Sequence, residues 1–152
     1  MSHDSSDREP AHVREQTEAL LHPIMLAAGS SALDLGCGSG GALGRLSELV
    51  GPSGRVVGVD QDGASLAAAR ALTRERDLAN VEIVQADARE TGLPRSSFDL
   101  VHVRMLLVNP PRGPEQVVDE VPGLVYPAGR LRRWSPTIHS GSVPASSRRF
   151  SG

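Results

Sequence analysis

The sequence predicts an α/β fold, a doubly wound Rossmann-like parallel sheet, and three observations support this prediction. Apolar, β-branched runs of strand length alternate with segments whose apolar residues recur at helical spacing. A loop with four glycines in six residues, 36–41, joins the first strand to the next helix. Aspartates stand at or near the ends of three strands, at positions 34, 60 and 87. Because the carboxyl ends of parallel strands meet at one edge of a sheet, the pattern predicts a ligand site there.

The composition is that of a single globular domain. The chain has 152 residues, enough for one domain with a hydrophobic core and too few for two ordinary ones. No apolar run approaches the length of a membrane span, and the polar N-terminus does not resemble a signal peptide. One cysteine excludes an internal disulfide, so we expect a cytoplasmic protein. Aromatic residues make up 3% of the chain, which argues against nucleic acid bound by stacking.

Charge is unevenly distributed along the chain. All 18 acidic residues lie at or before Glu120, whereas no acid accompanies the arginines from Arg130 onward. Residues 132–152 are rich in Ser, Arg and Pro without periodicity, so we expect a disordered basic tail. Residues 1–11 are polar, and we expect a disordered leader there. The predicted domain spans residues 12–131.

The first predicted unit is a helix, a strand and a second helix. Apolar residues recur at helical spacing over Val13–Ala28, with an interruption at His22-Pro23. Ser31–Leu35 is a short apolar strand, and Ala42–Val50 again places leucines at helical spacing. The glycine loop therefore lies between a strand and a helix.

This loop suits a nucleotide-type ligand. Glycines allow positive φ and close approach of a ligand, and the following helix turns free amides toward the loop. Gly36, Gly38 and Gly41 fit G-x-G-x-x-G, which alone is a weak sign of a dinucleotide site. Asp34, two residues before the first glycine, places a carboxylate where a pyrophosphate would be repelled. An acid there favours a ligand with an amino group or a positive charge.

The next two strands end in acids that suit a nucleoside. Arg55–Asp60 is a continuous run of the kind buried on both faces of a parallel sheet. Asp60 lies 24 residues after Gly36, close to the spacing at which an acid meets ribose hydroxyls. That signal is shared by several nucleoside ligands. The third strand, Asn80–Asp87, again ends in an aspartate.

The remaining elements follow the same alternation. They are a helix capped by Asp62, a fourth strand and a last helix, at Gly63–Arg76, Phe98–Val103 and Pro114–Val125. His102 lies within the fourth strand, and we interpret it as a core histidine. Arg104 lies at the end of that strand, where it could bond to a ligand. After Leu131 the sequence offers no apolar run for a fifth strand.

Asp34, Gly36, Gly38 and Gly40 fill the pattern acidic-x-G-x-G-x-G. The chain here resembles motif I of the class I S-adenosylmethionine-dependent methyltransferases, of the methyltransferase-domain 11/25 type. Leu93-Pro94 and the Phe98-Asp99 strand start extend the resemblance, which covers about residues 12–131. The later strands of the family's sheet are not recognised, so the resemblance implies a domain truncated after strand four or five, with its C-terminal strands missing.

The resemblance implies S-adenosylmethionine as the cofactor. Asp34 would serve its ammonium end, Asp60 its ribose, Asp87 the adenine amine, and the Ala88 amide a ring nitrogen. The full set of expected cofactor contacts is Asp34, Gly36, Cys37, Gly38, Gly40, Asp60, Gln61, Asp87, Ala88 and Arg104. No catalytic base can be named, and we expect no metal.

The predicted function is methyl transfer to a small-molecule acceptor that the sequence does not identify. With strands missing, we expect poor solubility, weak cofactor binding and little methyl transfer. One alternative is a non-catalytic or inactive truncated remnant that binds the cofactor or nothing. Another is an NAD(P)-dependent oxidoreductase, which Asp34, Asp87 and the absence of lysine oppose. We expect no membrane or nucleic-acid partner, and the oligomeric state is left open.

Overall fold

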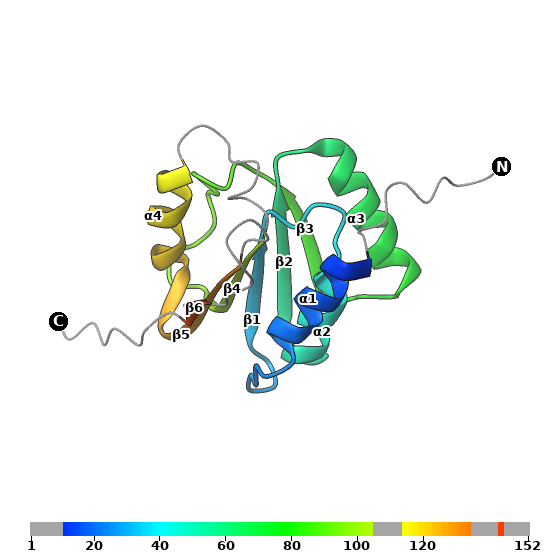
Figure 1. Cartoon of the computed structure of the whole chain (residues 1–152), viewed down its shortest axis with the longest axis horizontal. Helices are drawn as coiled ribbons and strands as arrows, with labels where there is room; N and C mark the ends of the chain where they lie inside the picture. The colour runs from blue at the N-terminus through cyan, green and yellow to red at the C-terminus, as the bar shows by residue number, and fades with distance from the viewer. Residues whose placement is uncertain (1–10, 105–113, 135–142, 145–152) are drawn as a thin grey trace.

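A computed structural model describes residues 11–104, 114–134 and 143–144. Its centre is a six-stranded sheet with the strand order β3-β2-β1-β4-β5-β6, and helices lie on both faces (Figure 1). β1 to β5 run parallel, and β6 is antiparallel to β5. The predicted doubly wound α/β fold is confirmed. No helix in the described part of the chain is long and apolar enough to cross a membrane.

The elements of the first half lie where the sequence predicts them. They are α1 Ala11–Leu21, β1 Ser31–Leu35, α2 Leu43–Val50, β2 Arg55–Asp60, α3 Gly63–Glu75 and β3 Val81–Gln85. β1 and β2 have the predicted bounds. The first helix ends at Leu21, just before the predicted interruption at His22-Pro23, and does not resume to Ala28. Pro23 cannot donate a backbone hydrogen bond, and the residue before a proline disfavours helical geometry.

The second half contains β4 Phe98–Arg104, α4 Pro114–Leu124, β5 Val125–Trp134 and β6 Val143–Pro144. The structure differs here from the prediction, because β5 includes Arg132–Trp134 and pairs them with His102–Arg104. Ladder hydrogen bonds join main-chain groups, so a run with two arginines can still pair. The predicted domain boundary at residue 131 falls inside β5, and most of the predicted basic tail lies outside the described residues.

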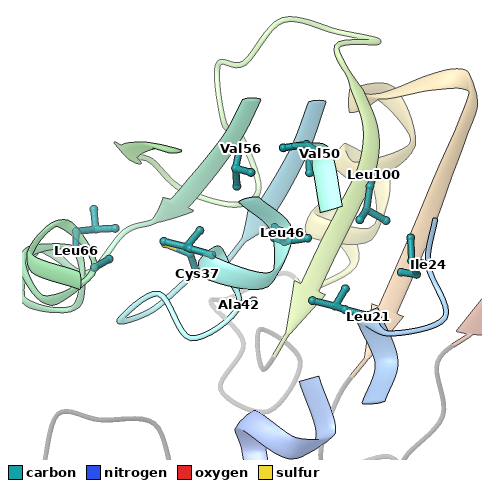
Figure 2. Packing of buried hydrophobic residues seen from close by; sticks show 12 residues of the cluster. Leu21, Ile24, Cys37, Ala42, Leu46, Val50, Val56, Leu66 and Leu100 are labelled. Carbon is teal, nitrogen blue, oxygen red and sulfur yellow. The ribbon is translucent and has the colours of Figure 1, made fainter. Parts of the chain in front are cut away.

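The sheet separates two hydrophobic cores because successive side chains of a strand point to opposite faces. One core packs α1, α2 and α3 on Ala32, Val56 and Leu100, as Figure 2 shows for its labelled members. The other core packs α4 on the alternate residues of the same strands. Its fully or nearly buried members include Leu33, Leu35, Val57, Val59, Val101, Val103, Val117, Val121 and Leu124. Burial on both faces explains the continuous apolar runs in β1 and β2.

Candidate functional site

The site predicted at the carboxyl edge of the sheet lies where the strand order changes direction. β1 pairs with β2 on one side and with β4 on the other. The chain first adds strands outward through β2 to β3 and then returns to add β4 beside β1. Ligands of open α/β sheets bind in the crevice at such a point. The glycine loop follows β1, Asp60 ends β2, and Asp87 follows β3.

The glycine loop has the backbone that its sequence predicts. Gly36, Gly38 and Gly40 have φ values of 78°, 53° and 93°, in the left-handed region that favours glycine. These are the glycines of the acidic-x-G-x-G-x-G pattern. A Cβ on Gly38 would meet nothing within 4 Å, whereas a Cβ on Gly40 would lie 3.0 Å from Leu43 and 3.2 Å from Leu72. The loop is therefore packed on the helices at Gly40 and open at Gly38.

Asp60 fixes the shape of this loop. One carboxylate oxygen accepts a hydrogen bond from the Gly38 amide at 2.9 Å, and the other accepts from the Asp62 amide at 2.9 Å. The Asp62 side chain in turn accepts from the Ser65 amide at 2.9 Å, which confirms it as the N-cap of α3. An ionised carboxylate has about four lone-pair positions, so Asp60 keeps acceptor capacity for a further ligand.

Asp87 lies two residues past β3 and pairs with Arg89. Arg89 donates to both carboxylate oxygens from its side chain and to one of them from its amide. These hydrogen bonds are the main reason that the pKa of Asp87 falls from 3.8 to about 2. The neighbouring Ala88 is buried, and its amide has no hydrogen-bond partner among the residues described. Asp87 is therefore ionised at neutral pH, and it lies beside a backbone amide to which no described residue is hydrogen-bonded.

A hollow of about 410 Å³ opens next to this aspartate. Asp87, Arg89, Glu90 and Gln116 line it, so it lies between the segment after β3 and the start of α4. A hollow of this size accommodates a small ligand. Its lining carries charges of both signs.

Asp34 is buried beneath the loop rather than exposed to it. Its side chain is almost fully buried, and one carboxylate oxygen lies 3.0 Å from Nδ1 of His102 on the adjacent strand. The other oxygen has no hydrogen-bond partner in the described structure. A ligand could reach Asp34 only through water or after a shift of the loop.

Cys37 contributes its backbone to the loop and its side chain to the core. Its amide donates a hydrogen bond to the Val59 carbonyl at 2.8 Å. Its side chain packs in the core under α1, α2 and α3, which Figure 2 shows. Burial, followed by the charges of Asp34 and Asp60, raises the pKa of the thiol. The thiol therefore stays protonated and is not a nucleophile.

For two of the predicted contact residues, Gln61 and Arg104, only the position of the backbone bears on the site. Gln61 follows Asp60 and accepts from the Gln85 side chain through its carbonyl at 3.1 Å. Arg104 ends β4 opposite Trp134 of β5. The ten predicted residues thus gather along neighbouring strand ends, with Asp60 and Gly38 in direct contact.

Some residues of the site were not predicted. Arg89 was missed, although its place two residues after a strand-terminal aspartate was a usable signal. The pairing of His102 with Asp34 was missed because the two residues are 68 positions apart. A further contact, in which Glu120 of α4 accepts from the Thr91 hydroxyl at 3.0 Å, holds α4 against the segment after β3.

The arrangement can bind and orient a ligand, but two of its titratable groups are poor proton acceptors. The Cys37 thiol keeps its proton, and the low pKa of Asp87 makes it a weak base. His102 is buried against Asp34. No group of three possible metal-binding side chains occurs within the described ranges.

Comparisons with known proteins agree with this geometry. The sequence model of a family described as "Methyltransferase domain" matches residues 32–129. The chain is 38% identical over 103 residues to the demethylmenaquinone methyltransferase of Lactococcus lactis, covering 68% of this chain and 40% of that protein. It is 34% identical over 130 residues to an uncharacterized 37.1 kDa protein of a Streptomyces fradiae transposon, covering 86% of this chain and 37% of that protein.

A solved structure shows the same fold. The chain superposes on a SAM-dependent methyltransferase from Aquifex aeolicus with a TM-score of 0.73 and 24% identity, covering 82% of this chain and 66% of that one. The chain spans half or less of the length of the curated relatives that it matches. The family match covers most of the described sheet and includes the glycine loop, Asp60 and Asp87. The chain therefore belongs to the methyltransferase-domain family of class I S-adenosylmethionine-dependent methyltransferases.

Proposed function

We propose that this domain binds S-adenosylmethionine at the carboxyl edge of its sheet and transfers the methyl group to a small-molecule acceptor. The observation that carries the proposal is the Asp60 carboxylate, which holds the Gly38 amide while keeping acceptor capacity. A ribose diol needs such an acceptor, and it would lie beside the open position at Gly38.

The other parts of the cofactor fit groups on either side of Asp60. Asp87 is ionised and can accept from an adenine amine if Arg89 shares it, and the Ala88 amide can donate to a ring nitrogen. At the amino-acid end, the unpartnered oxygen of Asp34 suits an ammonium group reached through water. Arg104 is proposed from its backbone position alone.

The bound cofactor would supply a methyl group on a sulfonium, ready for in-line displacement. The residues of this chain would contribute alignment and exclusion of water, effects that can supply about 7–11 kcal/mol in well-oriented reactions. Because the Cys37 thiol keeps its proton and Asp87 is a weak base, we favour an acceptor whose nucleophilic atom is already electron-rich. The relatives named demethylmenaquinone methyltransferase make a demethylmenaquinone the first acceptor to test.

Isothermal calorimetry with S-adenosylhomocysteine and NADH tests the proposal. We expect S-adenosylhomocysteine to bind and NADH not to bind. Tighter binding of NADH would favour the oxidoreductase, and binding of neither ligand would leave a domain without a cofactor. Transfer of a labelled methyl group to a demethylmenaquinone analogue then tests the acceptor separately from the cofactor. We also propose a cytoplasmic location from the single, buried, free cysteine, which cell fractionation can check.

A further inference from the structure

Asp34 and His102 form a buried pair at the centre of the sheet. They occupy matching positions on the adjacent strands β1 and β4, and their side chains are 1% and 2% exposed. Their neighbours two residues earlier, Ala32 and Leu100, belong to the core under α1, α2 and α3. Side chains two apart on a strand share a face, so the pair lies on that side of the sheet.

The pair leaves two polar atoms without partners. Oδ2 of Asp34 and Nε2 of His102 are both buried and lack a hydrogen bond to any described residue. On the other side of Asp34 stands Gly58 of β2, and a Cβ there would lie 3.1–3.2 Å from Leu43, Cys37 and Ile83. Leaving such groups unsatisfied in a closely packed core is unfavourable, which suggests that the pair serves a ligand.

The contact between Asp34 and His102 needs a proton on one of its two atoms. When Asp34 is ionised its carboxylate can only accept, so the 3.0 Å contact then has the proton on Nδ1 of His102. In the neutral ring Nε2 is then an acceptor, and so is Oδ2 of Asp34. Both unpartnered atoms therefore need a donor. An ammonium group and a water molecule are donors of the required kind.

We propose that His102 is a positioning residue for cofactor binding. Its Nδ1–H holds one oxygen of Asp34, so that the second oxygen stays fixed beneath the glycine loop and orders a water for the ammonium end of the cofactor. The inference rests on the proposed function and adds to it a residue on β4 that does not itself touch the ligand. His102 acts through Asp34.

The test compares two ligands across three variants. Adenosine lacks the amino-acid end of S-adenosylhomocysteine, so the ratio of the two affinities isolates that end. His102→Leu should weaken S-adenosylhomocysteine about tenfold, which corresponds to about 1.4 kcal/mol, and should change adenosine less than about twofold. His102→Asn, whose amide can donate from a position close to Nδ1, should keep the wild-type ratio. Asp34→Asn should lower the affinity for S-adenosylhomocysteine relative to adenosine, as His102→Leu does. The double variant should bind S-adenosylhomocysteine no more weakly than either single variant.

Equal weakening of both ligands by His102→Leu would overturn the proposal and leave His102 a structural residue. If the wild-type chain binds neither ligand, the proposed function fails instead, and the two failures are thus distinguishable. Should His102→Leu not fold, nitrogen NMR of the wild-type imidazole decides. We expect Nδ1 to be protonated. A proton on Nε2 with Nδ1 bare would mean that Asp34 carries the proton, and this would overturn the proposal.

Discussion

The Asp60 carboxylate couples the shape of the glycine loop to ligand binding. The same two oxygens that would meet a ribose diol already hold the Gly38 and Asp62 amides. A substitution at Asp60 therefore changes both the ligand contact and the loop, and the two effects must be separated by a matched set of variants.

Asp60→Ala should weaken S-adenosylhomocysteine by about 30- to 700-fold, because roughly 2–4 kcal/mol of charge-assisted hydrogen bonding is removed. Asp60→Asn keeps one acceptor oxygen, so its affinity for S-adenosylhomocysteine should fall less. The control is Asp62→Ala, which removes an acid two positions away and should leave the affinity nearly unchanged. Calorimetry measures all three. Unchanged affinity in Asp60→Ala would refute the ribose contact.

The ion pair of Asp87 and Arg89 should make the folding stability depend on pH. The pKa of Asp87 is lower in the folded chain than its ordinary 3.8, so the pair favours folding above about pH 4. This contribution disappears as the pH falls through about 2. Because both side chains are about a third exposed, screening by solvent keeps this contribution small.

Carbon NMR of the Asp87 carboxyl group measures this pKa directly. We expect about 2 in the wild-type chain and a value nearer 3.8 in Arg89→Gln. Arg95→Gln serves as the control, because Arg95 pairs with Glu120 and not with Asp87. A pKa that is the same in all three chains would show that Arg89 does not hold the carboxylate in solution.

At the scale of elements, the start of α3 shows how a short sequence signal determines local structure. The Asp62 side chain accepts from both the amide and the hydroxyl of Ser65, at 2.9 Å and 2.6 Å. The amide would otherwise lack a partner within the helix. The Asp62 amide donates to Asp60, so Asp62 connects the site to the start of the helix.

Asp62→Ala should lower stability by about 1 kcal/mol, the usual effect of losing an N-cap. In a chain of this size the melting temperature should fall by about 2–4 °C. Asp62→Ser can still cap the helix and should melt close to the wild type. Thermal unfolding followed by circular dichroism compares the three chains. An unchanged melting temperature in Asp62→Ala would contradict the role of the cap.

The sequence predicted elements well where side chains alone determine them. The short apolar run of β1 and the β-branched run of β2 predicted the bounds of these strands, and the N-cap of α3 was predicted from Asp62. β5 was not predicted through Arg132–Trp134, because its pairing with β4 depends on main-chain groups. The site shows the same division: the loop glycines and Asp60 follow from local spacing, whereas the partner of Asp34 depends on the register of β1 against β4.

At the scale of the whole molecule, the sheet both separates two cores and positions the site. The helices that cover its faces leave the carboxyl ends of β1, β2, β3 and β4 at one edge (Figure 1). Every predicted cofactor contact lies near that edge, and none lies at the starts of the strands. We therefore expect ligand binding to be confined to this edge of the molecule.

An amide NMR titration of the uniformly labelled chain with S-adenosylhomocysteine tests that claim most directly. We expect saturable shifts at Gly36, Gly38, Gly40 and Ala88. Amides at the opposite edge, such as Ser31 and Gly54, should stay within the spread of the rest of the chain. Shifts centred on Ser31 and Gly54, or no shift at any of the six amides under a saturating ligand concentration, would contradict the account.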